Sequence, residues 1–65
     1  HVGLSNRELE VLKMIAVGKT IKEIASELGL SGKTVATYRT RLSEKMGLTT
    51  NVELARYALQ HHLTD

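Results

Sequence analysis

The stretch IKEIASELGLSGKTVATY, residues 21–38, predicts two short helices joined by a tight turn. Thr20 precedes the first helix and Glu23 follows three residues later, which is the spacing of a capping box. Gly29 predicts the end of this helix, because glycine adopts the left-handed backbone conformation there at little cost. Ser31 is a typical helix-starting residue, so the second helix is expected to begin directly after it.

Small and apolar residues predict how these two helices pack. Ala25 stands where they would cross, and a larger side chain there would push them apart. The inward stripe of the second helix is expected to contain Val35, Leu42, Met46 and one of Tyr38 and Arg39. The pattern is typical of a DNA-reading helix-turn-helix, whose second helix enters the major groove, although any helical hairpin could show it.

The composition of the 65-residue chain predicts one small domain and excludes several classes of protein. It contains no cysteine, so neither a disulfide framework nor a cysteine-based metal site is expected. No apolar run approaches the roughly 20 residues of a membrane span, and no signal peptide is recognisable. We therefore expect a cytoplasmic domain without membrane contact, held together by helix packing alone.

The positive charge is concentrated in the middle of the chain. Residues 19–45 contain six basic and three acidic side chains, a local net charge of +3, whereas the remaining residues together carry −1. A one-sided basic region is the electrostatic footprint of a protein that binds the phosphate backbone of nucleic acids. A solvated helix face would give the same pattern, so charge alone leaves both interpretations open.

Capping residues and apolar spacing predict four helices and no strand, which makes the fold class all-α. Two further capping boxes, Ser5 with Glu8 and Thr50 with Glu53, mark the starts of the first and last helices. Gly47 predicts the end of the third helix. We expect one domain over residues 1–65, with helices at about residues 6–17, 21–28, 32–46 and 51–62.

The last predicted helix has two apolar faces, although a terminal helix can bury only one face in a small core. One face is formed by Leu54, Ala58 and His61, with Tyr57 on its flank. The opposite face is formed by Val52, Ala55, Leu59 and Leu63. We expect this second face to make a homodimer with another copy. The predicted interface residues are Val52, Glu53, Ala55, Arg56 and Leu59. A mildly exposed apolar stripe is the alternative, and if Leu59 belonged to the core, the face with Leu54 would become the candidate interface.

No arrangement of residues predicts catalysis, a cofactor or a metal site. Residues 32–34, Gly-Lys-Thr, resemble the end of a phosphate-binding loop, but Glu27 stands where that motif needs its first glycine. His61 and His62 are adjacent and point to different faces of a helix, without metal-ligand spacing. We expect one histidine to be partly buried and the other to lie on the surface. The chain is not expected to be an enzyme.

Four blocks of residues match a known family in order and spacing. They are Leu4-Ser5-x-Arg7-Glu8, Lys22-Glu23-Ile24-Ala25, Lys33-Thr34-Val35 and Lys45-Met46-Gly47-Leu48. With them, residues 4–58 resemble the LuxR-type helix-turn-helix domain, the DNA-binding effector half of FixJ/NarL-class response regulators. Within this family the segment Lys33–Arg39 most resembles the GacA and BvgA type.

The resemblance implies a four-helix fold of the LuxR/NarL C-terminal effector type and a role in transcription control. The third helix would lie in the major groove of double-stranded DNA, and the fourth would form a homodimer. A receiver or other regulatory domain is implied upstream in the full-length chain. Ala36 departs from the family pattern, in which many members have a basic residue or asparagine there, and this affects which DNA sequence is read.

The outward face of the third predicted helix indicates which residues would contact DNA. Bases are usually read from the N-terminal half of a recognition helix. The predicted base-reading residues are Ala36, Thr37, Thr40 and Arg41. The predicted phosphate contacts are Thr20, Lys22, Lys33, Thr34, Tyr38 and Lys45.

Some of these residues have an alternative role in the fold. Thr34 would also bond its own backbone at the helix start, and Tyr38 would instead be a ring at the edge of the core. Arg39 would pack its stem on the core and form a salt bridge with an acid such as Glu8 or Glu10. For the whole chain, the alternative is a protein-interaction or dimerisation module without DNA affinity. The polar, threonine-rich outer face of the third helix favours DNA, since a protein-binding face should be more apolar.

Overall fold

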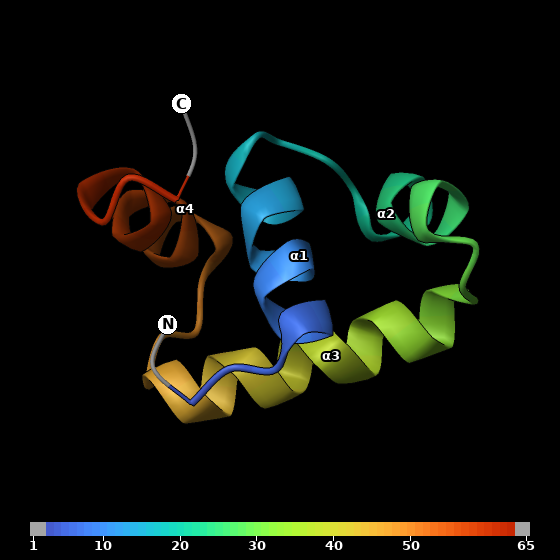
Figure 1. The fold of residues 1–65 in the computed structure, drawn as a ribbon, viewed down its shortest axis with the longest axis horizontal. Coiled ribbons are helices and arrows are strands. Elements are labelled where there is room, and N and C mark those ends of the chain that lie inside the picture. Colours follow the sequence, from blue (N-terminus) through green and yellow to red (C-terminus); the bar gives the residue numbers. More distant parts are fainter. Residues whose placement is uncertain (1–2, 64–65) are drawn as a thin grey trace.

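Four helices follow one another in the computed structural model, which describes residues 3–63 (Figure 1). They are α1 (Asn6–Ala16), α2 (Ile21–Leu28), α3 (Gly32–Met46) and α4 (Asn51–Gln60). The described residues contain no strand, so the all-α prediction is confirmed. The predicted bounds of α2 and α3 agree with the structure, whereas α1 and α4 end one and two residues earlier than expected. Residues 1–2 and 64–65, the ends of the predicted domain, lie outside the described residues.

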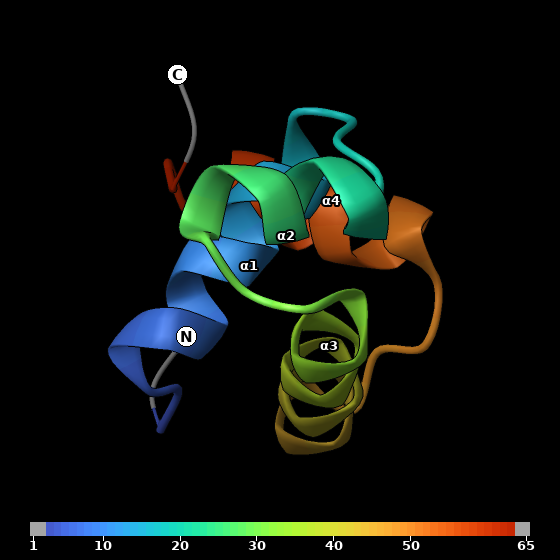
Figure 2. The same ribbon diagram turned by 90° about the vertical axis from the view of Figure 1, so that its right-hand side faces the viewer.

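α1 stands at the centre of the fold, between α2 and α4, and α3 runs below these three helices (Figure 1). Turned by 90°, the view shows α3 nearly end-on beneath the rest of the molecule (Figure 2). α1 packs against both α3 and α4, and α2 packs mainly against α3. This arrangement leaves one long side of α3 without another helix on it.

Side chains of all four helices meet in one core. Val11 and Leu12 of α1 are inaccessible to solvent, and Ile15 is nearly so. Val35 of α3 is fully buried and Ala25 of α2 is 7% exposed, as their predicted roles in helix packing require. The other buried apolar residues are Ile24, Leu42, Leu54 and Ala58. The apolar spacing of the sequence therefore predicted the buried faces correctly.

Each helix starts at a capped residue, as the sequence predicts. Ser5 Oγ accepts a hydrogen bond from the Glu8 N–H at 3.2 Å, and Glu8 Oε1 accepts one from the Ser5 N–H at 2.8 Å. The same reciprocal pair is formed by Thr20 with Glu23 and by Thr50 with Glu53. Ser31 Oγ accepts from the Thr34 N–H at 3.1 Å. These bonds satisfy amide groups that have no partner within the helix, which fixes where each helix begins.

The ends of α2 and α4 use the same left-handed turn with different residues. Gly29 takes this conformation after α2, with φ of 67°, whereas His62 takes it after α4, with φ of 55°. A side chain is strained there, because its Cβ lies close to the following carbonyl oxygen. The turn lets the Leu63 N–H donate to the Ala58 carbonyl at 2.8 Å. Leu63 therefore packs against the core and does not lie on the outer face where the helical pattern placed it.

The two apolar faces of α4 differ in exposure as predicted. Leu54 and Ala58 are fully buried on the side that packs against α1. Val52 and Leu59 are 66% and 65% exposed. Leu59 is not part of the core, so the condition for an interface on the face with Leu54 is not met.

Candidate nucleic-acid interface

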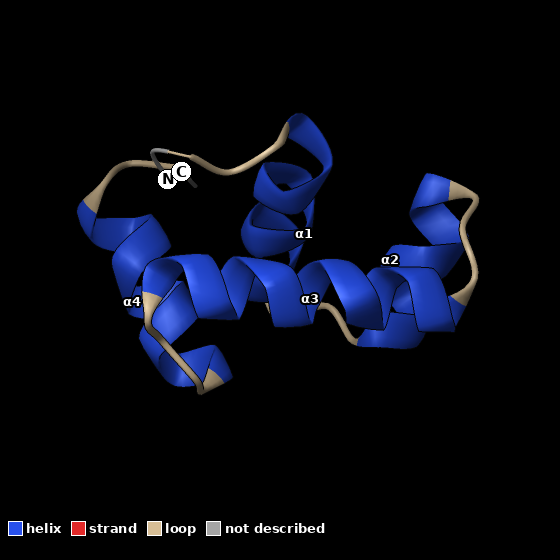
Figure 3. Ribbon diagram, turned by 90° about the horizontal axis from the view of Figure 1, so that it is seen from below, coloured by secondary structure: helices blue, strands red, loops and turns tan. Residues whose placement is uncertain are grey.

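The outer side of α3 is open along the whole helix. In the view from below, α3 runs across the front of the molecule with α1 behind it (Figure 3). The exposed residues of this helix include Lys33, Ala36, Thr37, Thr40, Arg41 and Glu44. The large apolar side chains that are exposed in the described chain are Val17, Val52 and Leu59, and none of them lies on α3. The outer side of α3 is therefore polar, while its inner side belongs to the core.

All four residues predicted to read bases, Ala36, Thr37, Thr40 and Arg41, are exposed. The Thr37 hydroxyl donates to the carbonyl oxygen of Lys33 at 3.0 Å. Its proton is thus used by the helix backbone, and Thr37 offers its γ-methyl group and hydroxyl lone pairs to a ligand. Arg41 takes part in no ion pair among the described residues, so its guanidinium is available for a base edge.

The first turn of α3 joins two hydroxyl groups. Ser31 Oγ and Thr34 Oγ1 are 2.9 Å apart, and either can be the donor. The Thr34 hydroxyl thus bonds a side chain, so the expectation that it would bond its own backbone was wrong. Tyr38 is partly buried and packs against the core, which agrees with a ring at the core edge.

The basic residues of the central region divide into paired and open side chains. Lys19 Nζ lies 2.5 Å from Glu27 Oε1 and 2.6 Å from Glu27 Oε2, so its charge is compensated. Lys22 at the start of α2 and Lys33 at the start of α3 are exposed and form no ion pair in the described part of the chain. Together with Arg41, they form the open positive charge of the helix-turn-helix.

Lys45 has a partner in α1, which the sequence did not predict. Its Nζ lies 2.7 Å from Glu8 Oε1 and donates to the Gly3 carbonyl oxygen at 3.2 Å. Glu8 is only 2% exposed. The hydrogen bond from Lys45, followed by that from the Ser5 backbone, lowers the pKa of the Glu8 carboxyl, so the group is ionised. The charge of Lys45 is therefore already compensated before any phosphate approaches.

Arg39 does not bond to Glu8 or Glu10, so the predicted salt bridge was wrong. Its Nη2 donates to Asn51 Oδ1 at 2.8 Å and to the Thr49 carbonyl oxygen at 2.9 Å, and its Nε reaches the same Asn51 oxygen at 3.2 Å. Glu8 is bound by Lys45, and Glu10 lies 3.7 Å from Arg7. The partners of Arg39 follow it in the chain by ten and twelve residues and carry no local sequence signal.

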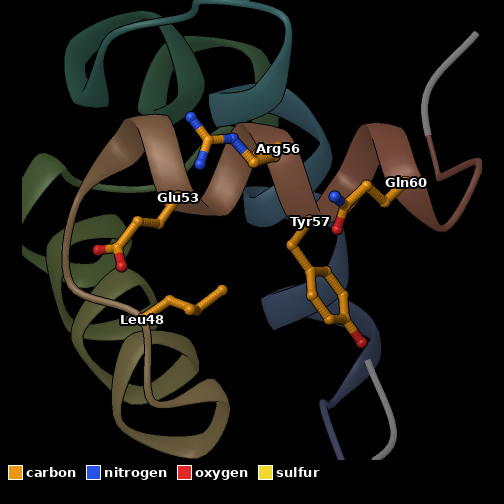
Figure 4. A pocket seen from close by; sticks show the side chains of 5 residues that line it. All are labelled: Leu48, Glu53, Arg56, Tyr57 and Gln60. Atoms are coloured by element: carbon orange, nitrogen blue, oxygen red, sulfur yellow. The ribbon is translucent and has the colours of Figure 1, made fainter.

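A surface pocket of about 190 Å³ lies against α4 (Figure 4). Its lining consists of Leu48, Glu53, Arg56, Tyr57 and Gln60. The ring of Tyr57 stacks on that of His61, with centroids 4.2 Å apart. Both histidines are exposed, so the prediction that one of them is partly buried was wrong. Val52 and Leu59 form the exposed stripe of α4, and neither of them lines the pocket.

The sequence matches the family described as "Bacterial regulatory proteins, luxR family" over residues 2–58. The chain belongs to this family. Three relatives illustrate the relationship. BvgA, a virulence-factor transcription regulator of Bordetella pertussis strain Tohama I, is 50% identical over 60 residues, which are 92% of this chain and 29% of BvgA. The transcriptional regulatory protein UhpA of Escherichia coli K12 is 53% identical over 53 residues, 82% of this chain and 27% of UhpA. The response regulator GacA of Pseudomonas aeruginosa is 45% identical over 62 residues, 95% of this chain and 29% of GacA.

The resemblance to the LuxR-type helix-turn-helix is thereby confirmed, and α2 and α3 are the two helices of the predicted helix-turn-helix. The chain spans less than a third of the length of each of these relatives. Among residues 3–63, no group of three or more histidine, aspartate or glutamate side chains could hold a metal ion. No helix in that range is long and apolar enough to cross a membrane.

Proposed function

We propose that this luxR-family domain is the effector domain of a bacterial response regulator and controls transcription by binding a specific DNA sequence in the cytoplasm. The names of UhpA and GacA, as a transcriptional regulatory protein and a response regulator, support this role. The observation that carries it is the open polar side of α3, opposite the side on which Val35 and Leu42 are fully buried. The receiver or other regulatory domain upstream is part of the same proposal. The domain acts as a binding module without catalysis or a cofactor.

α3 reads the major groove through the four exposed residues of its outer side. Arg41 donates two bonds to the edge of a guanine, which is the commonest specific contact in this groove. Thr40 donates or accepts a hydrogen bond at a base edge, and Ala36 and Thr37 present methyl groups that fit the methyl of thymine. The back-bonded hydroxyl of Thr37 favours this apolar role.

The phosphate contacts surround this face. Lys22 and Lys33 supply open positive charge, and Thr20, Thr34 and Tyr38 supply hydroxyl groups at the helix starts and on the flank of α3. Lys45 is assigned a weaker phosphate contact than its position in the sequence predicts, because Glu8 already binds its ammonium group. Its main role is to join the end of α3 to the start of α1.

The second copy in a homodimer is proposed to pack on the exposed stripe of α4. Val52 and Leu59 supply the apolar contact, with the half-buried Ala55 between them and Arg56 on the flank. Glu53 contributes less, because its carboxylate already accepts bonds from the backbone of Thr50 and Thr49. A two-fold axis there would set two α3 helices in successive major grooves, about 34 Å apart.

The absence of large exposed apolar residues on α3 argues against a protein-interaction module without DNA affinity. A titration of the chain with random-sequence duplex at several salt concentrations tests the choice. We expect log K to fall linearly with log salt, with a slope of about 0.9 per phosphate contacted. Lys33→Ala should reduce the magnitude of this slope by about 1. Lys13→Ala removes the same charge from an exposed position of α1 and should leave the slope unchanged. Salt-independent affinity, or equal effects of the two variants, would refute the proposed interface.

A further inference from the structure

Arg39 is a basic side chain of α3 that the proposed DNA contacts do not use. Its guanidinium donates hydrogen bonds to two acceptors beyond the end of α3, the Thr49 carbonyl oxygen and Asn51 Oδ1. Both Nε and Nη2 donate to Asn51, which is the first residue of α4. A planar guanidinium that donates from two nitrogens to one side chain fixes the orientation of that side chain as well as its distance.

Hydrogen bonds hold the connection between α3 and α4 along its length. The Leu48 N–H donates to the Ser43 carbonyl oxygen at 3.2 Å, and the Ser43 hydroxyl donates to the Leu48 carbonyl oxygen. Glu53 Oε1 accepts from the N–H groups of Thr49 and Thr50 at 3.2 and 3.0 Å. With Arg39 bound to the Thr49 carbonyl, this connection forms a rigid elbow, which we define as residues 47–50.

Helix packing fixes the angle between α3 and α4 only indirectly, through α1. α4 packs against α1, and α3 packs against α1 and α2, whereas direct packing between α3 and α4 is at most marginal in the described chain. α3 crosses below α1, whereas α4 lies beside it (Figure 1). The elbow and Arg39 are therefore the direct link between the helix that enters the groove and the helix with the exposed stripe.

We infer that Arg39 is a positioning residue that sets the angle between α3 and α4 and thereby the spacing of the two DNA half-sites. The inference rests on the proposed dimer through α4. In a two-fold dimer, a rotation of α4 relative to α3 occurs in both copies, so both copies contribute to the change in the distance between the two recognition helices. Arg39 thus acts on specificity through Asn51, without touching a base.

The competing interpretation is that Arg39 binds a DNA phosphate, as a basic residue on a recognition helix commonly does. The two interpretations differ in what a lysine at this position would do. A lysine keeps the charge but has no planar fork, so it restores a phosphate contact and fails to restore the bonds to Asn51 and Thr49. Asn51 offers the reciprocal change, because Asn51→Asp keeps the acceptor Oδ1 and Asn51→Ala removes it.

The test measures binding of the chain to duplexes by fluorescence anisotropy. A half-site is first selected from a randomised pool by the unmodified chain. Two inverted copies are then placed about 10 base pairs apart, or at spacings longer and shorter by about two and four base pairs. Each variant is titrated with this panel and with a duplex that contains one half-site, and its thermal unfolding is recorded to confirm that it is folded.

We expect the unmodified chain to prefer its best spacing by about tenfold or more, which corresponds to ~1.4 kcal/mol, the scale of one charge-assisted hydrogen bond. Arg39→Ala, Arg39→Lys and Asn51→Ala should reduce this preference to about twofold. Their affinity for one half-site and their salt slope should stay unchanged, and Asn51→Asp should retain the spacing preference. Arg41→Ala is the matched control on the same helix. It should weaken binding to one half-site and keep the spacing preference.

Three results would overturn the inference. If Arg39→Ala weakens binding to one half-site and Arg39→Lys restores it, Arg39 is a phosphate contact. If Arg39→Ala and Asn51→Ala both keep the spacing preference of the unmodified chain, the dimer stands and Arg39 does not position it. If the unmodified chain shows no spacing preference, both the dimer and the inference are wrong. Should Arg39→Ala not fold, the comparison of Asn51→Ala with Asn51→Asp decides alone.

Discussion

Two leucines of α4 should differ strongly in how much stability the same substitution removes. Leu54 is fully buried against α1, whereas Leu59, five residues later, is 65% exposed. Truncation of a buried leucine to alanine costs about 2–5 kcal/mol, from lost transfer free energy and from the cavity left behind. A domain of this size has a free energy of unfolding of roughly 3–10 kcal/mol at the usual value per residue. Leu54→Ala should therefore remove about half of the stability, whereas Leu59→Ala should change it by about 0.5 kcal/mol or less.

Thermal and urea unfolding, followed by circular dichroism at 222 nm (the standard helix signal), measure both effects. At about 4–8 °C per kcal/mol for a small domain, Leu54→Ala should lower Tm by about 8–40 °C, and Leu59→Ala by no more than about 4 °C. The urea m-value should stay the same in both variants, which would show that the unfolded ensembles are comparable. Equal shifts for the two leucines would refute the assignment of one face of α4 to the core and the other to solvent.

Three further predictions concern charge, backbone conformation and assembly. Hydrogen bonds lower the pKa of the three capping carboxyl groups, Glu8, Glu23 and Glu53, below the ordinary value of 4.5. The largest contribution comes from Lys45 for Glu8 and from the backbone N–H groups of the caps for Glu23 and Glu53. Because the folded-state pKa is the lower one, their stabilisation is present above pH 4.5 and is lost as pH falls through the folded-state values, so Tm should drop as pH is lowered below 4.5; a constant Tm on acidification below pH 4.5 would contradict the caps. His62→Gly should raise the free energy of unfolding by about 1 kcal/mol, because it relieves the left-handed strain. The control Gln60→Gly, at the last residue of α4, should lower the free energy of unfolding, and a loss in both variants would show that His62 is unstrained. Leu59→Asp should leave the fold and the affinity for one half-site unchanged and abolish cooperative binding to two half-sites; retained cooperativity would exclude the exposed stripe as the dimer contact.

The sequence by itself determined the starts of the four helices, the ends of α2 and α3, and the buried faces. Ser5 and Glu8 are three residues apart, so the box they form depends only on local backbone geometry. Gly29 ends α2 for an equally local reason. The apolar spacing was enough to bury Val35 and Leu54, because a regular helix maps sequence separation directly onto its faces. The four matching blocks also identified the family before any coordinate was needed.

The tertiary structure decided which charged side chains are open to a ligand and which hold the fold together. Lys45 and Glu8 are separated by 37 residues, and Arg39 and Asn51 by twelve across a turn of the chain. Neither pairing can be derived from spacing, because it depends on the angles at which α1, α3 and α4 cross. Sequence reasoning therefore treated Lys45 as a phosphate contact and assigned Arg39 to Glu8 or Glu10. Leu63 shows the same limit on a smaller scale, since the left-handed turn at His62 redirects it from the helix surface to the core. Distances along a helix follow from the sequence, whereas contacts between helices exist only once the whole core has formed.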